Sequence, residues 1–364
     1  MQQEFYEKRV VVMGLGVSGL WTARWLADQG AFVTGSDVNA EGDLDPLIIK
    51  ELRERGVKLE TGGHREKTFS TAEMIIISPG VPHDLPILGA SMKGGVKVAG
   101  ELELASRLIE TPLIAVTGTN GKSTVTEFLG LLLKNAGYDV FVGGNIGTPL
   151  MAYAAGQRKA DYVVVEVSSF QLDTIERFCP HLSIILNISP DHLDRYPDYE
   201  SYVRSKLKIF RNQGPGRFLI LNNEDERLSS LNPTSGLCVY RYGVKKKDGL
   251  HAFIENGKAV ADLGGGKRNS FLLQSFGLPG NHNLENLLAL VLSGLTLGID
   301  ARAIQKTIDE FRGLPNRLER VGEIDGVLFY NDSKATNVDA AVRAVVSFDR
   351  SLILIAGGRH KGAD

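Results

Sequence analysis

The sequence has little of what marks membrane, exported or nucleic-acid-binding proteins. No apolar run approaches the roughly 20 residues that a bilayer-spanning helix needs, and Met1–Glu4 lacks the basic start of an export signal. The only cysteines, Cys179 and Cys238, have neither metal-site nor disulfide-framework spacing. A formal net charge of −2 is unlike that of a protein that binds a phosphate backbone. We therefore expect a cytoplasmic monomer with no membrane or nucleic-acid partner.

The length and the hydrophobic pattern indicate two or three α/β domains. The chain has 364 residues, too many for one ordinary core. Apolar strands alternate with helical stretches along most of it, which favours parallel sheets covered by helices. Residues 236–276, interrupted by glycines, predict antiparallel hairpins added to that core. Further on, strands at 327–330 and 351–356 flank a helix at 338–346; since two strands cannot bury a parallel sheet, we expect the given sequence to end inside a domain.

A glycine loop between an apolar strand and a helix is the strongest local motif. Residues Val116–Thr124 have the sequence VTGTNGKST. Gly118 and Gly121 allow successive backbone N–H groups to turn toward an anion at the start of the helix. Lys122 would bridge the β- and γ-phosphates of a nucleotide, and Ser123 would offer its hydroxyl to Mg²⁺. An exposed turn is the alternative, but strand, glycines, lysine and helix in this order favour a phosphate site.

A second glycine loop lies earlier in the chain. Gly14–Gly19 has the sequence GLGVSG between an apolar strand and a helix. The next strand ends at Asp37, close to the offset of about 20 residues at which dinucleotide-binding folds place an acid on the ribose. Taken alone, this pattern predicts an NAD-dependent oxidoreductase.

Polar residues follow several of the predicted strands. Glu166 interrupts an apolar strand, and a buried unpaired carboxylate is costly, so we expect either Mg²⁺ shared with Ser123 or a salt bridge to a lysine or arginine. Residues 187–197 carry acids, a histidine and an arginine just past another strand, as a site in an open α/β sheet does. The next helix carries Lys206 and Lys208, which its pattern alone predicts to be solvated.

Ordered motifs along the whole chain resemble the signatures of the Mur ligases. They are TGTNGKST at Thr117–Thr124, GGNIG at Gly143–Gly147, EVSSFQL at Glu166–Leu172, DHLDRYP at Asp191–Pro197, GNHN at Gly280–Asn283, LPNRLE at Leu314–Glu319 and NDSKATN at Asn331–Asn337. Their number and order make chance similarity negligible. The last motif resembles that of the D-glutamate-adding members; other Mur-type ligases and folylpolyglutamate synthases tend to carry a histidine-containing motif there.

The resemblance implies a three-domain α/β architecture. A Rossmann-like domain over 1–100 would bind the UDP part of the substrate, and a P-loop ATPase-like domain over 101–313 would bind ATP. Residues 314–364 would begin a third, Rossmann-like domain that binds the amino acid. The implied enzyme is an ATP-dependent, amide-bond-forming ligase that adds D-glutamate to UDP-N-acetylmuramoyl-L-alanine through an acyl phosphate, in peptidoglycan precursor synthesis.

The resemblance also implies roles for single residues. The catalytic residues would be Lys122, Glu166, His192 and Lys206. The ATP site would contain Gly118, Thr119, Asn120, Gly121, Lys122, Ser123, Thr124, Asn283, Asn286, Arg317 and Asp332. The UDP-substrate site would contain Gly14, Gly16, Val17, Ser18, Gly19, Asp37, Ser78, Asn145 and His192. The D-glutamate site would contain Lys334, Thr336 and Lys361. Mg²⁺ would be held by Ser123, Glu166, His192 and Lys206, the last as its carbamate.

Two other functions remain open at this stage. An NAD-dependent oxidoreductase would use the Gly14 loop but leave the Lys122 loop and Glu166 without a role. A P-loop nucleotide switch would hydrolyse or exchange nucleotide without any amino-acid substrate.

Overall fold

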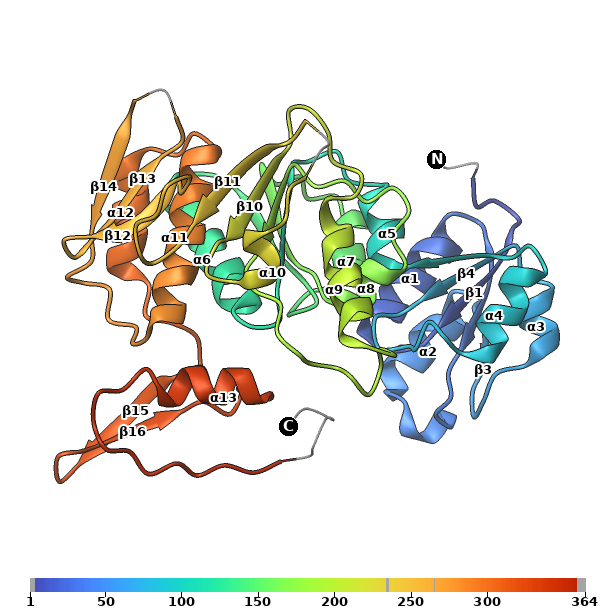
Figure 1. Ribbon diagram of the computed structural model, residues 1–364. Helices are drawn as coiled ribbons and strands as arrows, with labels where there is room; N and C mark the ends of the chain where they lie inside the picture. Colours follow the sequence, from blue (N-terminus) through green and yellow to red (C-terminus); the bar gives the residue numbers. More distant parts are fainter. Residues whose placement is uncertain (1–3, 234–235, 265, 359–364) are drawn as a thin grey trace. The chain divides into compact units, whose positions relative to one another are not determined.

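The computed structural model describes residues 4–233, 236–264 and 266–358. Its contacts gather into two compact units. The first contains the chain up to Thr111 together with Gly143–Lys159 and Val167–Cys179, and the second contains the remainder (Figure 1). The domain limits expected near residues 100 and 313 stay a prediction. No described helix is both long and apolar enough to cross a bilayer.

The first unit is built on a five-stranded parallel sheet in the order β3-β2-β1-β4-β5. Its strands are β1 (Arg9–Met13), β2 (Phe32–Ser36), β3 (Lys58–Glu60), β4 (Met74–Ile77) and β5 (Lys97–Gly100). Its helices are α1 (Val17–Asp28), α2 (Pro46–Glu54), α3 (Glu66–Ser70), α4 (Pro86–Lys93), α5 (Glu101–Ser106), α7 (Leu150–Ala154) and α8 (Ser169–Asp173), with the 3₁₀ turn η1 (Glu41–Asp43). This strand order is that of a doubly wound nucleotide-binding domain, as predicted.

The second unit contains a nine-stranded sheet in the order β14-β13-β12-β11-β10-β9-β6-β8-β7, apart from the last two residues of β7, which group with the first unit. Its strands are β6 (Leu113–Thr117), β7 (Val140–Gly144), β8 (Tyr162–Glu166), β9 (Leu182–Ile185), β10 (Phe218–Asn222), β11 (Cys238–Tyr242), β12 (Ala252–Glu255), β13 (Lys258–Asp262) and β14 (Arg268–Leu272). Its helices are α6 (Lys122–Asn135), α9 (Tyr199–Leu207), α10 (Glu226–Ser229), α11 (Asn281–Thr296) and α12 (Ala301–Glu310), with η2 (Lys208–Phe210).

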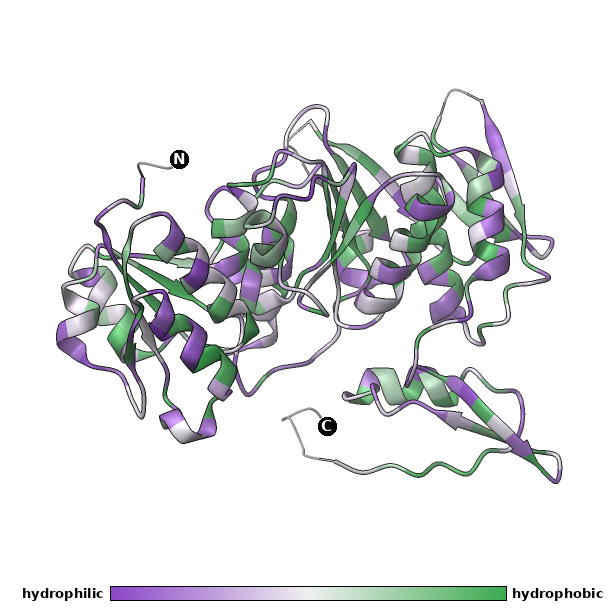
Figure 2. Cartoon of the chain, turned by 180° about the vertical axis from the view of Figure 1, so that it is seen from behind, coloured by the Kyte–Doolittle hydropathy of each residue, from purple (hydrophilic) through white to green (hydrophobic). Residues whose placement is uncertain are grey.

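Continuous apolar strands form the cores because helices cover the sheets. Figure 2 shows the hydrophobic residues concentrated along the strands of both large sheets. In the second unit, residues 287–292 of α11 are fully buried against the sheet. The rings of Phe128 in α6 and Phe311, just past α12, stack with centroids 4.0 Å apart. This packing fixes α6 and α11, the two helices that border the candidate site.

The hairpins expected over residues 236–276 are confirmed only in part. Strands β12, β13 and β14 pair antiparallel, but β11 pairs parallel with β10, and that part of the prediction is wrong. The connection between β10 and β11 contains α10, and a crossover with a helix returns the chain in the same direction.

The last described segment also differs from the prediction. The hairpin β15 (Glu319–Ile324) and β16 (Val327–Asn331) precedes α13 (Val338–Val345), close to the predicted helix. The prediction of a strand at 351–356 is wrong, because residues 351–358 form no strand. Ile353 and Ile355 in this segment are 93% and 95% exposed. A strand requires a neighbour for its backbone hydrogen bonds, and among the described residues none pairs with this segment.

Candidate active site

The loop between β6 and α6 has the geometry of an anion cradle. Gly121 precedes the first turn of α6 with φ of 84°, and a Cβ there would lie 2.6 Å from the side-chain oxygen of Asn286. Both constraints require glycine. No side chain caps the start of α6, so its first N–H groups face the loop without a side-chain acceptor, as in phosphate-binding helices.

Lys122, Ser123 and Glu166 converge at this loop. Lys122 Nζ donates hydrogen bonds to the carbonyl oxygens of Gly118 at 3.0 Å and Thr119 at 2.9 Å. Burial lowers the pKa of Lys122 more than the nearby Glu166 carboxylate raises it. Ser123 Oγ donates to Glu166 Oε2 at 2.6 Å, and Glu166 is only 2% exposed. A cation, a hydroxyl and a buried carboxylate therefore lie at one end of α6.

This hydroxyl–carboxylate pair fits a magnesium ion. Among the described residues, no three histidine, cysteine, aspartate or glutamate side chains form a ready-made metal cage. Mg²⁺ commonly needs no such cage, because one or two protein oxygens plus substrate phosphates suffice. Ser123 and Glu166 are two oxygen ligands of the kind that Mg²⁺ prefers.

Lys206 is buried beside the same loop. Its Nζ donates to the Gly118 carbonyl at 2.8 Å and lies 4.6 Å from the centre of the Tyr202 ring. The side chain is 2% exposed, so the helical pattern, which predicted a solvated lysine, was wrong, and Lys208 is half-buried as well. His192 has φ of 55°, and its Nε2 lies 3.7 Å from Asp191 Oδ2. Lys206 therefore reaches the glycine loop from α9.

A pocket brings together most of the residues expected to bind the nucleotide. Of those residues, Asn120, Gly121, Thr124, Asn283, Asn286, Arg317 and Asp332 line it. Arg317 also donates to Ser123 Oγ at 2.8 Å, which connects the pocket to the Ser123–Glu166 pair. Lys334, expected at the D-glutamate site, lines this pocket too. Thr336 is exposed, and Lys361 lies outside the described residues.

The pocket also contains residues that the sequence did not single out. They include Asn187, His282, Glu285 and Arg343. Burial lowers the pKa of His282 to about 4, so its ring is neutral at physiological pH. Asn187 and His282 stood inside motifs already noted, whereas Glu285 and Arg343 lie on helices where charged residues usually face solvent.

In the first unit, Gly19 and Ser78 pack closely against the backbone of Gly14. Gly14 has φ of 89°, and a Cβ on Gly19 would lie 1.9 Å from the Gly14 carbonyl oxygen. Ser78 Oγ donates to that same carbonyl at 2.8 Å. A Cβ on Gly16 would meet nothing within 4 Å, so open space lies over the start of α1.

The acid expected to bind a ribose holds the loop backbone. Asp37 is 6% exposed, and its carboxylate accepts hydrogen bonds from the backbone N–H of Leu15 at 2.7 Å and of Asn39 at 2.9 Å. Val17 is exposed at the start of α1, Ser18 is half-buried beside it, and Asn145 is exposed in its own loop. Each oxygen of Asp37 thus accepts one backbone N–H group, that of Leu15 in the Gly14 loop and that of Asn39 in the segment after β2.

Comparison with known proteins decides the family. Residues 8–100 match the Mur ligase MurD-like N-terminal domain, and residues 116–294 match the Mur ligase middle domain. The chain is 44% identical to the UDP-N-acetylmuramoylalanine–D-glutamate ligase of Desulfosudis oleivorans, over 99% of this chain and 78% of that protein. It is 40% identical to the ligase of the same name from Pelotomaculum thermopropionicum, over 100% of this chain and 80% of that protein. The chain belongs to the Mur ligase family.

Solved Mur ligase structures have the same fold. The MurC ligase of Thermotoga maritima aligns with a TM-score of 0.54 at 23% identity, over 94% of this chain and 77% of its own. The MurF ligase of the same organism, solved with ADP, aligns with a TM-score of 0.53 at 17% identity, over 96% of this chain and 74% of its own. The predicted α/β Mur ligase architecture is therefore confirmed, and as a Mur ligase the chain is an ATP-dependent ligase.

Proposed function

We propose that this Mur ligase adds D-glutamate to the L-alanine carboxylate of UDP-N-acetylmuramoyl-L-alanine, as a cytoplasmic step of peptidoglycan precursor synthesis. The relatives named for that reaction, at 40–44% identity over nearly the whole chain, support it. The observation that supports the chemistry is the convergence of Lys122, Ser123 and Glu166 at the start of α6.

The first step activates a carboxylate. A carboxylate is a poor electrophile, so its oxygen attacks the γ-phosphate of ATP, a bond forms to phosphorus, and ADP leaves. The products are an acyl phosphate and ADP. Lys122 withdraws from its contacts with the Gly118 and Thr119 carbonyls to neutralise the phosphates, which otherwise repel the incoming anion. A bound Mg²⁺ on Ser123 and Glu166 would supply further charge neutralisation.

The second step forms the amide. The D-glutamate amine, as its free base, attacks the acyl carbon, and collapse of the tetrahedral intermediate breaks the bond to phosphate, which leaves with the proton that the nitrogen loses. Lys334 and Thr336 are proposed to hold the D-glutamate carboxylates, with Lys361. Lys206 is proposed to act as its carbamate, because CO₂ addition would turn a buried cation beside the glycine loop into an anionic metal ligand. The neutral amine and the acyl phosphate must meet without water, which would hydrolyse the intermediate.

The UDP part of the substrate is proposed to lie over the Gly14 loop. The uncapped start of α1 and the open space at Gly16 suit a diphosphate. Asp37 supports this site by fixing the loop through the N–H group of Leu15. Asn145 and His192 are proposed to contact the muramoyl part.

Phosphate release with each amino acid in turn tests this function. We expect release from ATP only when UDP-N-acetylmuramoyl-L-alanine and D-glutamate are both present, with L-glutamate, L-alanine, meso-diaminopimelate and D-alanyl-D-alanine as matched negatives. Release with another amino acid would indicate a different Mur-type ligase. Phosphate release without any amino acid would favour a nucleotide switch. A saturable change in NADH fluorescence on titration with the protein would favour the NAD-dependent oxidoreductase.

A further inference from the structure

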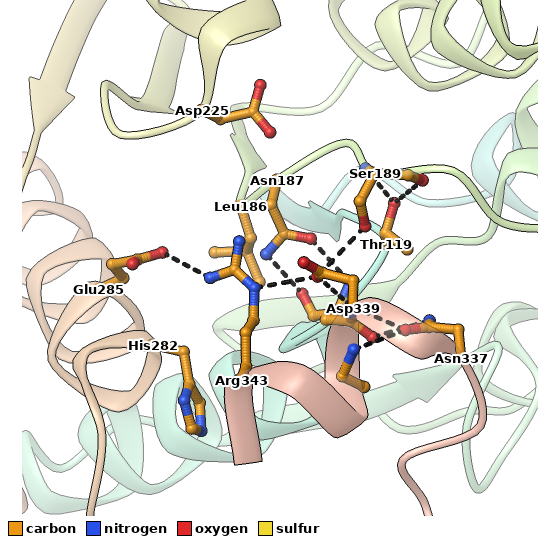
Figure 3. Close-up of polar contacts among 12 residues, drawn as sticks. Thr119, Leu186, Asn187, Ser189, Asp225, His282, Glu285, Asn337, Asp339 and Arg343 are labelled. Carbon is orange, nitrogen blue, oxygen red and sulfur yellow. Dashed lines mark hydrogen bonds and ion pairs between the residues drawn. The ribbon is translucent and has the colours of Figure 1, made fainter. Parts of the chain in front are cut away.

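The start of α13 is connected to the phosphate loop through a small polar network. Asn337, Asp339 and Arg343 of this segment reach the loop, the segment after β9 and helix α11 (Figure 3). Asn337 and Asp339 lie more than 200 positions from Asn120, the loop residue that both contact. Nothing in the proposed chemistry uses them.

Asn120 is held at both its backbone and its side chain. Its N–H donates to Asn187 Oδ1 at 2.8 Å, and its carbonyl accepts from Asn187 Nδ2 at 3.1 Å. Its side-chain amide donates to Asp339 Oδ2 at 2.8 Å and exchanges hydrogen bonds with the Asn337 amide at 3.3 and 3.1 Å. The backbone contacts come from Asn187, just past β9, whereas the side-chain contacts come from Asn337 and Asp339 at the start of α13.

Asp339 is the centre of this network. Its Oδ2 accepts from Asn120 Nδ2, from Ser189 Oγ at 3.2 Å and from Arg343 Nε at 2.9 Å. Hydrogen bonds to a charged acceptor are stronger than those between neutral groups. One carboxylate therefore joins the phosphate loop, the segment after β9 and the next turn of α13.

Arg343 connects the network to the wall of the nucleotide pocket. It lies between Asp339 and Glu285 of α11, with Nη1 at 3.5 Å from Glu285 Oε2 (Figure 3). Asn222, at the end of β10, donates to the same Glu285 oxygen at 2.9 Å. Arg343 and Glu285 both line the pocket. The chain of contacts thus runs from the loop at Asn120 to α11, which carries Asn283 and Asn286.

We propose that Asp339 and Arg343 are positioning residues that fix Asn120 of the phosphate loop in its ATP-binding conformation. The proposal rests on the proposed function, since it assigns ATP to this pocket. A loop held in place before binding loses less conformational entropy when the nucleotide arrives. Docking of α13 on the loop then strengthens ATP binding without either residue touching the reacting atoms.

Binding of a non-hydrolysable ATP analogue with Mg²⁺, followed by calorimetry, tests the proposal. We expect Asp339→Asn and Arg343→Met each to weaken analogue binding by about tenfold, the size of one charge-assisted hydrogen bond. KM for ATP should rise by a similar factor while kcat changes less, and Arg343→Lys should recover part of the loss. Asp349→Asn, the same change at an exposed aspartate beyond α13, is the matched control and should bind like the wild type.

Two readouts separate a positioning role from a purely structural one. Affinity for UDP-N-acetylmuramoyl-L-alanine should stay unchanged, and thermal unfolding of Asp339→Asn should stay close to that of the wild type. Analogue binding by both variants that equals the wild type would overturn the proposal. Tighter binding would do so as well, because α13 would then compete with the nucleotide. Absence of analogue binding to the wild type would instead contradict the proposed function.

Discussion

The two glycine loops of this chain share a backbone plan but not a chemistry. Each follows a buried parallel strand and opens a helix whose first N–H groups have no side-chain cap. The Gly14–Gly19 loop carries no charged side chain, and the acid nearest it, Asp37, is bonded to backbone N–H groups. The second loop carries Lys122 and Ser123, and Ser123 is bonded to Glu166. Helix-end physics is enough to bind a diphosphate, but phosphoryl transfer also needs a cation and metal ligands.

The largest expected effect comes from removing the cation of the second loop. We expect Lys122→Ala to lower phosphate release by about a thousandfold or more, because the variant lacks the cation that neutralises the phosphates. Among the other described cations, Lys206 alone donates to one of the two carbonyls that Lys122 contacts, that of Gly118. The malachite-green assay measures it. Lys134→Ala, an exposed lysine near the end of the same helix, is the control and should keep full activity. Near-normal phosphate release by Lys122→Ala would contradict the claim that the second loop supplies the cation for phosphoryl transfer.

The next effect concerns the buried lysine beside that loop. We expect Lys206→Ala to be inactive and to recover part of its activity when short carboxylates such as acetate or formate are added, because they replace the carbamate. Lys208→Ala, two residues along the same segment, serves as the control. If no small carboxylate restores activity, the carbamate is contradicted, and Lys206 would act as a cation through its 2.8 Å bond to the Gly118 carbonyl.

Two glycines of the first loop separate folding from binding. A Cβ on Gly19 would lie 1.9 Å from the Gly14 carbonyl oxygen, so Gly19→Ala should lower stability by at least about 2 kcal/mol. A Cβ on Gly16 meets no protein atom, so Gly16→Ala should unfold like the wild type and bind the UDP substrate about tenfold more weakly. Thermal unfolding and calorimetry measure the two effects. Unchanged UDP-substrate affinity in Gly16→Ala would mean that the ligand does not approach this helix end.

The last effect, which leaves ligand binding unchanged, is a stability change in the first unit that depends on pH. Burial raises the pKa of Glu101 to about 7, although its carboxylate accepts a hydrogen bond from the Met151 N–H at 2.6 Å. The folded state therefore keeps a proton that the unfolded state loses from about pH 4.5 upward, so this group lowers stability as pH rises to about 7. Glu101→Gln keeps an acceptor and removes the charge. In denaturant titrations at pH 8, we expect the free energy of unfolding of this variant to exceed that of the wild type by up to about 3 kcal/mol. At pH 4 the two should be equal.

Local motifs predicted the second loop well because its parts are close in sequence. Lys122 and Ser123 are adjacent, and a single carboxylate at the end of an apolar strand identified Glu166. The burial of Lys206 was different, since its partner Gly118 is 88 residues away and helical pattern alone predicted solvent. Only the family resemblance pointed to it.

The residues that the sequence did not reveal depend on long-range packing. Asp339 and Arg343 form an i,i+4 pair of the kind that usually lies on a solvated helix face, and their contacts with Asn120 and Glu285 exist only in the folded chain. The direction of β11 and the missing strand at 351–356 have a similar cause. Strand pairing is decided by neighbours, which apolar content does not report.

One set of titrations tests whether the second loop binds ATP while the first loop binds the UDP substrate. Calorimetry with Lys122→Ala would measure its affinity for a non-hydrolysable Mg·ATP analogue and for UDP-N-acetylmuramoyl-L-alanine. Our account predicts that the variant loses the analogue and keeps wild-type affinity for the UDP substrate. Retained analogue binding, or loss of both ligands in a variant that is still folded, would contradict it.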